Sequence, residues 1–150
     1  MNTVYHTATP EETEKIGSLL AKEILEDGNA PRFVALFGDL GVGKTAFVRG
    51  VASVIAPGAV IRSPTFALVH EHLSGKIPLF HFDLYRITGE DDLYSIGFDD
   101  YLARKGLCLT EWSENIESEL PAHYYRVTIR KCGKEKFVCP WEALMVEQDK

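Results

Sequence analysis

Apolar residues in the N-terminal part of the chain recur at helical spacing and predict a helix that runs from Thr9 to about Asp27. Thr9 can cap this helix, Pro10 fits its first position and Glu12 completes a capping box. A short strand is expected just before it, at residues 4–7. The apolar stripe that we expect to be buried consists of Ile16, Leu19, Leu20, Ile24 and Leu25.

A strand followed by a second amphipathic helix is predicted next. Residues 33–37 (FVALF) are all apolar, as is typical of a parallel strand that is covered on both faces. Residues 45–56 then repeat apolar side chains at i, i+3/i+4 and i+7/i+8, which predicts a helix despite Gly50 in its interior. The chain therefore passes from a buried strand through a glycine-rich turn into a helix N-terminus, whose dipole favours anions.

The rest of the chain continues this alternation of strands and helices. The expected elements are 59–72 (loop, then strand), 77–83 (strand), 90–105 (helix, broken at Gly97), 107–110 (strand), and 125–130 with 135–139 (a hairpin). Their order predicts a single α/β domain over residues 1–150, with a mostly parallel central sheet and antiparallel additions. Ligands of such sheets bind at the carboxyl ends of the strands, so functional residues are expected there.

Composition narrows the class of protein. The 150 residues suit one ordinary domain, and a net charge of −6 with dispersed acidic residues argues against a broad nucleic-acid surface, DNA included. Three cysteines without C-x-x-C spacing favour free thiols in a cytoplasmic protein over a disulfide framework or a zinc site. The first residues do not have the pattern of a signal peptide, and no apolar stretch is long enough for a membrane span.

The glycine-rich turn fits G-x-x-x-x-G-K-[ST], the phosphate-binding P-loop, as Gly38-Asp39-Leu40-Gly41-Val42-Gly43-Lys44-Thr45. Its glycines let successive backbone N–H groups point at the phosphates of a nucleoside triphosphate. Lys44 is expected on the β- and γ-phosphates, and the hydroxyl of Thr45 on Mg²⁺. The expected fold thereby becomes a three-layer sandwich of the P-loop NTPase type. A glycine-rich turn that binds nothing is the alternative.

Two acidic residues end predicted strands at the same edge of the sheet. Asp83 closes the run LFHFD, an imperfect Walker B segment because His81 interrupts its apolar residues, and Glu111 closes LCLTE. Either carboxylate could bind magnesium, directly or through water, or orient the attacking water. The alternatives are a helix cap or an ion pair with Arg86 for Asp83, and an N-cap of the following segment for Glu111.

Three further patterns have both a chemical and a purely structural interpretation. Hydroxyls flank a proline in Ser63-Pro64-Thr65, where Thr65 could reach the γ-phosphate or the water, or simply begin a strand. His70 and His72 share a strand face and could bind a metal, but a solvated face is the preferred interpretation because no third ligand is apparent. Trp112 could stack on a nucleotide base or pack in the core.

Several classes of nucleotide-binding protein lack support in this sequence. No D-x-x-G follows Asp83 and no N-K-x-D occurs, which argues against Ras-like GTPases. No Arg-rich lid resembles that of nucleoside monophosphate kinases, and the signatures of ABC-type and AAA-type ATPases are absent. A domain of this size has no room for a separate substrate domain, which favours a minimal nucleotide-binding unit that needs partners.

Four segments, GDLGVGKTAFVRG, SPTFALV, HFDLYR and CLTEW, occur in this order and together resemble the TsaE (formerly YjeE) family of bacterial P-loop ATPases. The resemblance runs from about Thr9 to about Trp112. It implies a role in forming threonylcarbamoyladenosine beside the anticodon of tRNAs, in which the ATPase binds a TsaD–TsaB pair that modifies tRNA. The resemblance further implies that hydrolysis of ATP supports repeated turnover and that tRNA is a partner indirectly, through the complex.

The resemblance also implies roles for individual residues. The phosphate site of the family matches residues 38–45, its magnesium-associated positions match Thr45 and Glu111, and its Walker-B-like aspartate matches Asp83. Thr65 lies in its switch-like SPT loop. The nucleotide base is expected near the N-terminal segment and the C-terminal hairpin, where the candidates are Thr9, Pro10 and Gly133.

Two positions depart from the family pattern. Val42 stands where Ala is frequent, which should leave the loop intact because this position contributes backbone. Ala46 stands where a second Thr is frequent, so that the hydroxyl of Thr45 alone must serve the metal.

These expectations combine into a slow, magnesium-dependent ATPase that needs its partners for full activity. ATP and Mg²⁺ are the expected cofactors; Lys44 and the loop amides stabilise the charge that develops, and Asp83 or Glu111 orients the water. Two alternatives remain open. One is a small-molecule kinase, for which neither an acceptor pocket nor a lid is evident. The other is a nucleotide-gated protein-binding module, in which hydrolysis only resets a contact.

Overall fold

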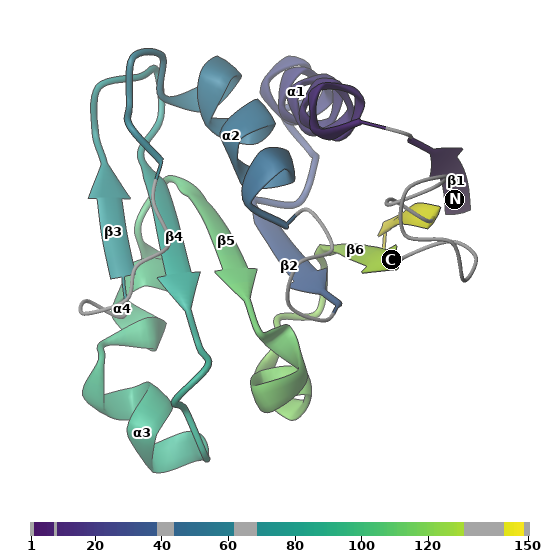
Figure 1. The fold of residues 1–150 in the computed structure, drawn as a ribbon. Coiled ribbons are helices and arrows are strands. Elements are labelled where there is room, and N and C mark those ends of the chain that lie inside the picture. Colours follow the sequence, from purple (N-terminus) through teal and green to yellow (C-terminus); the bar gives the residue numbers. More distant parts are fainter. Residues whose placement is uncertain (1, 8, 39–43, 62–68, 131–142, 149–150) are drawn as a thin grey trace.

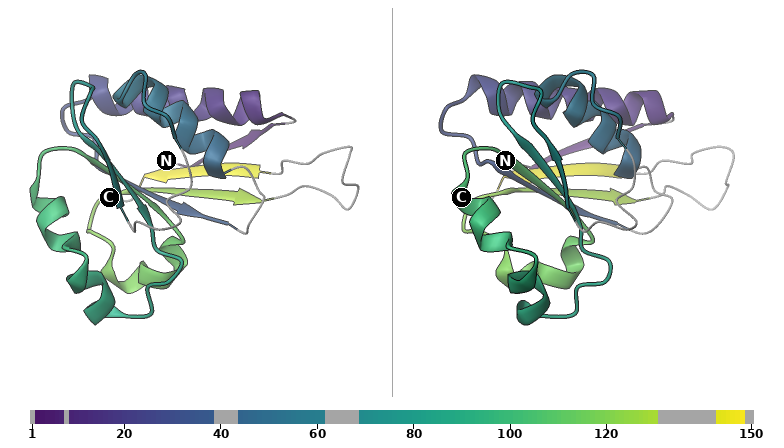
Figure 2. Two further views of the ribbon diagram at one scale, coloured as in Figure 1. Left: turned by 60° about the vertical axis from the view of Figure 1, so that its left-hand side comes forward. Right: turned by 90° about the vertical axis from the view of Figure 1, so that its left-hand side faces the viewer.

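The described residues of the computed structural model form a seven-stranded sheet with helices on both faces (Figures 1 and 2). These residues are 2–7, 9–38, 44–61, 69–130 and 143–148. The strands are β1 (Asn2–His6), β2 (Phe33–Phe37), β3 (Val69–His72), β4 (Leu79–Asp83), β5 (Leu107–Glu111), β6 (Tyr125–Arg130) and β7 (Ala143–Gln148). The helices are α1 (Pro10–Glu26), α2 (Lys44–Ile55), α3 (Glu90–Ser95), α4 (Phe98–Ala103) and the 3₁₀ helix η1 (Ser113–Glu119).

The centre of the sheet is parallel and its flanks are antiparallel. The strand order is β1-β7-β6-β2-β5-β4-β3. Strands β6, β2, β5 and β4 run parallel, whereas β7 and β3 run antiparallel to their neighbours. This confirms the predicted α/β fold with a mostly parallel central sheet. Because parallel strands share their ends, β2, β4 and β5 finish at one edge, where Asp83 lies opposite Glu111.

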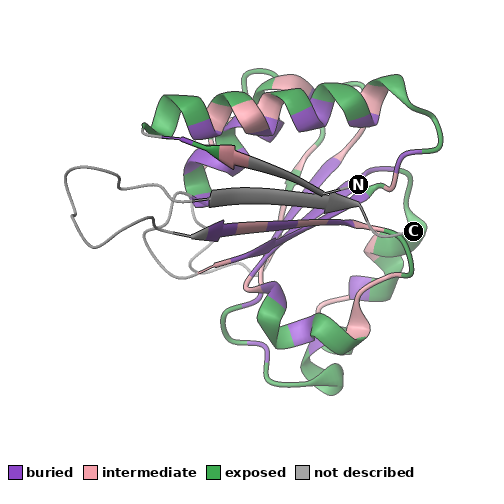
Figure 3. Ribbon diagram, turned by 90° about the vertical axis from the view of Figure 1, so that its right-hand side faces the viewer, coloured by how far each residue is buried: buried purple, intermediate pink, exposed green. Residues whose placement is uncertain are grey.

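Alternation along β2 divides the core between the two faces of the sheet. Val34 and Leu36 pack in the cluster under α1 and α2, whereas Phe33, Ala35 and Phe37 pack in the cluster with Phe98 of α4 and Ile116 of η1 on the other face. All five residues of β2 are buried, as the uninterrupted apolar run predicted. Figure 3 shows buried positions along the described strands of the sheet and exposed ones on the outer faces of the helices.

Helix α1 begins and ends where the sequence predicted. The hydroxyl of Thr9 accepts a hydrogen bond from the backbone N–H of Glu12 at 3.2 Å, Pro10 is the first helical residue, and the helix ends at Glu26. The expected apolar stripe is wrong at Leu19, which is 46% exposed, whereas Leu20 and Ile24 are buried. The cause is the position of α2, which packs against the face of α1 that includes Gly17 rather than the face with Leu19.

Two glycines allow α1 and α2 to approach at backbone distance. A Cβ atom on Gly50 would lie 1.8 Å from the carbonyl oxygen of Glu14, and one on Gly17 would lie 2.3 Å from the carbonyl oxygen of Phe47. Neither position leaves room for a methyl group. Gly50, which weakens the helical pattern of the sequence, is therefore explained by helix packing.

Replacing Gly50 with alanine is expected to lower the free energy of unfolding by about 2 kcal/mol or more. The clash with the Glu14 carbonyl forces the helices apart, which outweighs the gain of about 1 kcal/mol in helix propensity. Gly28→Ala is the matched control, because nothing lies within 4 Å of its added Cβ. Urea unfolding followed by circular dichroism measures both variants, and equal stability of the two would contradict the close packing.

The second half of the chain confirms one prediction and corrects another. The helix expected at residues 90–105 is divided at Gly97, whose φ of +77° ends α3 before α4 begins. Strand β6 pairs along its whole length with β7, which the sequence pattern did not predict. The hairpin arm expected at residues 135–139 lies outside the described residues.

Among the described residues, Cys108 is a free and buried thiol on β5. Burial raises its pKa to about 12, against a smaller opposing effect of the Arg104 charge, so the thiol is neutral and packs as an apolar group. Cys132 and Cys139 lie outside the described part of the chain. None of the helices in that part combines the length and the apolar content that crossing a bilayer requires.

Candidate active site

The residues of the predicted phosphate loop lie at the edge of the sheet where its parallel strands end. Gly38 follows the last residue of β2, and Lys44 and Thr45 begin α2. Thr9 and Pro10 begin α1 at this same end of the molecule (Figure 2). The intervening Asp39, Leu40, Gly41, Val42 and Gly43, like Thr65 and Gly133, lie outside the described residues.

Lys44 carries a buried positive charge that no described carboxylate neutralises by an ion pair. Lys44 is only 6% exposed. Its Nζ donates one hydrogen bond among the described residues, to the carbonyl oxygen of Gly38 at 2.8 Å. The same atom lies 4.4 Å from the ring centroid of Trp112, a cation–π contact. Among the described residues its close contacts are with these neutral groups, and the Asp83 carboxylate interacts with it electrostatically without an ion pair. A buried ammonium with three donors and no ion pair in that part of the chain is suited to an anionic ligand.

Trp112 supports Lys44 from an unusual backbone conformation. Its φ is 60°, and among the described residues no other residue except glycine has a positive φ. The adjacent Ser113 holds this turn, since its buried hydroxyl bonds both the hydroxyl and the carbonyl oxygen of Thr110, at 2.7 and 3.0 Å. Tyr85 packs edge-on against Trp112, with ring centroids 4.9 Å apart. The indole is thus part of the wall of the site: within the described part of the chain its ring contacts Lys44 and Tyr85, and the side chain also packs against the core cluster on that face of the sheet.

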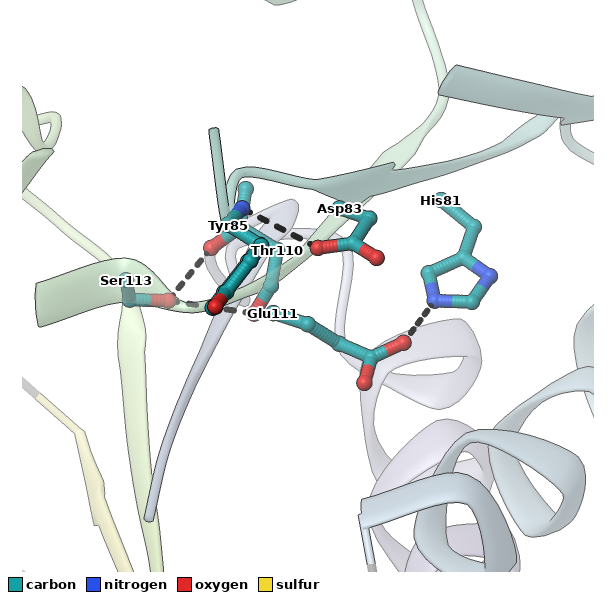
Figure 4. Close-up of polar contacts among 6 residues, drawn as sticks. All are labelled: His81, Asp83, Tyr85, Thr110, Glu111 and Ser113. Atoms are coloured by element: carbon teal, nitrogen blue, oxygen red, sulfur yellow. Dashed lines mark hydrogen bonds and ion pairs between the residues drawn. The ribbon is translucent and has the colours of Figure 1, made fainter. Parts of the chain in front are cut away.

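His81 and Glu111 form a buried pair on the sheet face that α2 covers (Figure 4). The Nε2 of His81 lies 2.5 Å from a carboxylate oxygen of Glu111, and the two side chains are 1% and 10% exposed. An ionised carboxylate only accepts hydrogen bonds, so Nε2 carries the proton and donates it. The other carboxylate oxygen of Glu111 has no hydrogen-bond partner among the described residues. The pair leaves that oxygen free while fixing the direction of the side chain.

Asp83 lies beside this pair at the end of β4, in register with Glu111. One of its oxygens accepts a hydrogen bond from the backbone N–H of Tyr85 at 3.0 Å, which is a turn contact and not the alternative helix cap, because α3 begins only at Glu90. The described part of the chain holds no ion pair between Asp83 and Arg86. Burial raises the pKa of Asp83, and the Glu111 charge acts in the same direction. The Tyr85 N–H, His81 and Lys44 oppose this rise. Asp83 is therefore a better proton acceptor than an ordinary aspartate.

Sequence reasoning missed two residues of this arrangement. His81 is noted in the sequence only as an interruption of apolar residues, although it lies two positions before Asp83 and so on the same face of the strand. Glu114 accepts a hydrogen bond from the backbone N–H of Gly38 at 2.9 Å and so ties η1 to the start of the phosphate loop. No sequence signal links Glu114 to Gly38, because the contact spans 76 positions.

His70 and His72 are only partly solvated, because both are half-buried while Glu71 between them is exposed. His70 lies against His81, with ring centroids 6.4 Å apart. Burial, and then the nearby His81, lower the pKa of both side chains. Within the described residues no group of three or more His, Cys, Asp or Glu is arranged to hold a metal ion.

A model of the family described as "Threonylcarbamoyl adenosine biosynthesis protein TsaE" matches residues 7–137. The chain belongs to the TsaE family. The match spans every candidate residue, from Thr9 to Gly133. All candidate residues of the site therefore lie within the part of the chain that matches the family.

Relatives named tRNA threonylcarbamoyladenosine biosynthesis protein TsaE cover most of the chain. The Bacillus subtilis protein is 36% identical over 132 residues, which are 88% of this chain and 80% of the relative. The Treponema pallidum protein is 34% identical over 120 residues, 80% of this chain and 85% of the relative. The crystal structure of Bacillus subtilis YdiB matches with a TM-score of 0.76 at 29% identity, covering 100% of this chain and 87% of that one.

The donor set of this TsaE-family site fits a hard cation such as Mg²⁺. Thr45 is exposed at the second residue of α2, and the free oxygen of Glu111 belongs to a side chain on the face that α2 covers. Asp83 contributes a second carboxylate at the same edge. All three offer oxygen atoms, and Mg²⁺ is commonly held by one or two carboxylates together with phosphates of its nucleotide.

Proposed function

We propose that this protein is a magnesium-dependent ATPase of tRNA threonylcarbamoyladenosine biosynthesis that acts on a TsaD–TsaB complex. The observation that carries the proposal is the buried ammonium of Lys44, which has no carboxylate partner among the described residues and begins the helix after a P-loop motif. Membership of the TsaE family supports the pathway. The ATPase activity, both cofactors and the partner complex belong to the proposal.

ATP is bound through its phosphates by residues 38–45. To bind the β- and γ-phosphates, Lys44 exchanges its hydrogen bond with the Gly38 carbonyl for bonds to phosphate oxygens, which are charge-assisted and stronger. The cation–π contact with Trp112 keeps the ammonium in place during that exchange. Thr9, Pro10 and Gly133 remain the candidates for the base pocket, and the Thr9 hydroxyl already serves α1 as its cap.

The Thr45 hydroxyl and the second carboxylate oxygen of Glu111 would hold Mg²⁺. When bound, it neutralises charge on the β- and γ-phosphates and so favours transfer of the γ-phosphoryl group to water. The hydrogen bond from His81 orients Glu111 before the ligand arrives, which reduces the entropy lost on binding. Asp83, with its raised pKa, accepts the proton of the attacking water.

A nucleotide-gated protein-binding module is the second candidate function. Tyr85 is 59% exposed and packs on Trp112, which in turn contacts Lys44. The phosphate site is therefore connected to an exposed aromatic side chain through two successive contacts, Lys44 with Trp112 and Trp112 with Tyr85. The small-molecule kinase stays a further candidate, and the pocket lined by Phe33 and Arg104 does not suit its acceptor, because that pocket lies at the opposite end of the sheet from the phosphate loop.

Two measurements on the same preparation test these functions. We expect release of phosphate from ATP, dependent on magnesium and increased by purified TsaD–TsaB. We also expect capture of TsaD–TsaB to be stronger with ATP than with ADP. Nucleotide-dependent capture without any hydrolysis would leave only the binding module, and phosphorylation of an added small acceptor would favour the kinase.

A further inference from the structure

We propose that a second ligand site lies at the end of the sheet opposite the candidate active site, and that it binds a small phosphate monoester with an apolar or aromatic body. A pocket of about 630 Å³ is found there. This volume is within the range of small-molecule sites, about 300–1,000 Å³. The proposal does not depend on the proposed function, since it concerns other residues and another ligand.

The pocket lies where two central strands begin. Phe33, the first residue of β2, lines it together with Gly106 and Cys108 at the start of β5. The backbone N–H of Cys108 donates to the carbonyl oxygen of Arg32 at 3.0 Å, which joins the two strand starts. Because β2 and β5 are parallel, their other ends lead to Gly38 and to Glu111. The length of the sheet therefore separates the pocket from the phosphate loop, and Figure 2 shows α4 at the end away from the start of α2.

The charge of the lining residues selects an anion. Arg32, Arg104, Lys105 and His123 line the pocket, and the lining contains no Asp or Glu. This is unusual in a chain with 22 acidic and 16 basic residues. Within the described part of the chain, neither Arg32 nor Lys105 forms an ion pair. Three permanent cations without a lining carboxylate match the double negative charge of a phosphate monoester better than a single carboxylate.

Arg104 is held in place before any ligand arrives. It pairs with Glu71 at 3.2 Å, and its guanidinium lies 4.4 Å from the ring centroid of Phe80 and 5.3 Å from that of Tyr101. The side chain remains 45% exposed, so donors not used by Glu71 are accessible. A planar guanidinium whose orientation is already fixed loses little entropy on binding, and its fork of donors matches phosphate geometry.

Apolar side chains form the rest of the pocket wall, so a ligand that fills the pocket needs an apolar part in addition to a phosphate group. Phe33, Ile77, Leu102 and Pro121 line the pocket beside the cations. The Cys108 thiol behind them is neutral, because burial raises its pKa to about 12. Apolar surface adjoining a cluster of cations is complementary to a ring or alkyl group that carries a phosphate. A nucleic-acid backbone would instead require a continuous basic surface, which a net charge of −6 disfavours.

Titrations followed by two-dimensional ¹H–¹⁵N NMR test the site, with the phosphate loop kept saturated by Mg²⁺ and a non-hydrolysable ATP analogue. The probes are phenyl phosphate, inorganic phosphate and phenol. We expect phenyl phosphate to shift the amide signals of Ala103, Gly106 and Cys108, and to bind about tenfold or more tightly than either of the other probes. Absence of these shifts, or equal affinity for phenol, would overturn the proposal.

Charge-matched variants separate a built site from general attraction of anions. Arg32→Gln combined with Lys105→Gln removes two cations of the pocket, and Lys15→Gln combined with Lys22→Gln removes two exposed cations of α1. The pocket variant should lose affinity for phenyl phosphate by about tenfold or more, and the α1 variant by less than about twofold. An equal loss in both variants would show that phenyl phosphate responds only to net charge and would exclude the site.

Discussion

Lys44→Ala is expected to reduce ATP hydrolysis by about 10²- to 10³-fold and to stop threonylcarbamoyladenosine formation in a reconstituted system. The variant removes the ammonium that we place on the β- and γ-phosphates, and Trp112 cannot replace its charge. Release of phosphate at saturating Mg²⁺ and ATP measures the first effect. Nucleoside analysis of tRNA incubated with the partner enzymes measures the second.

A control is needed because Lys44 is buried and bonded to Gly38. Lys22→Gln removes an equally charged but exposed side chain from α1 and should retain hydrolysis within about twofold. Thermal unfolding of both variants shows whether the fold is kept. Hydrolysis and tRNA modification at normal levels in a folded Lys44→Ala protein would refute the assignment of the phosphate site.

Substitutions of the two carboxylates are expected to have different kinetic effects. Glu111→Gln should raise the magnesium concentration for half-maximal hydrolysis by about tenfold or more, because it removes a charged ligand. Asp83→Asn should lower kcat by about 10²- to 10⁴-fold with little change in the magnesium requirement, because it removes the proton acceptor. Initial rates over a matrix of magnesium and ATP concentrations separate the two effects, and an exchange of the two phenotypes would reverse the roles.

His81 provides an independent check on the Glu111 role. His81→Ala leaves the Glu111 charge in place but removes the hydrogen bond that directs it, so the magnesium requirement should rise as in Glu111→Gln, to a smaller extent. His81→Asn keeps an N–H donor and should restore part of the loss. If both variants lose stability equally and neither changes the magnesium requirement, the histidine serves packing alone.

Local signals in the sequence predicted much of the fold because short-range interactions decide those features. The cap at Thr9 is a contact over three positions, and the break at Gly97 follows from the conformational freedom of one residue. The buried strand at residues 33–37 needed only its uninterrupted apolar run. The strand ends at Asp83 and Glu111 were placed for the same reason, since an acidic residue closes each apolar segment.

Other features depend on which distant segments come into contact, and local sequence patterns do not contain that information. Strand β6 pairs with β7, which follows it after residues 131–142. A local sequence pattern does not identify a partner at that separation. Leu19 fits the predicted apolar stripe of α1 as well as its buried neighbours do, but the position of α2 leaves it exposed. From the sequence alone, Gly50 only weakens the predicted helix. The structure explains the glycine, because the Glu14 carbonyl lies directly against it.

Local sequence patterns were enough to predict which chemical groups occur in this protein: a P-loop motif, two carboxylates at strand ends, and family motifs in their order. How those groups are held depends on contacts between distant segments. The pair of His81 and Glu111 joins residues 30 positions apart, and Glu114 reaches Gly38 over 76. Such contacts arise because a parallel sheet gathers strand ends from distant segments at one edge, and there burial and hydrogen bonds decide the direction of each side chain.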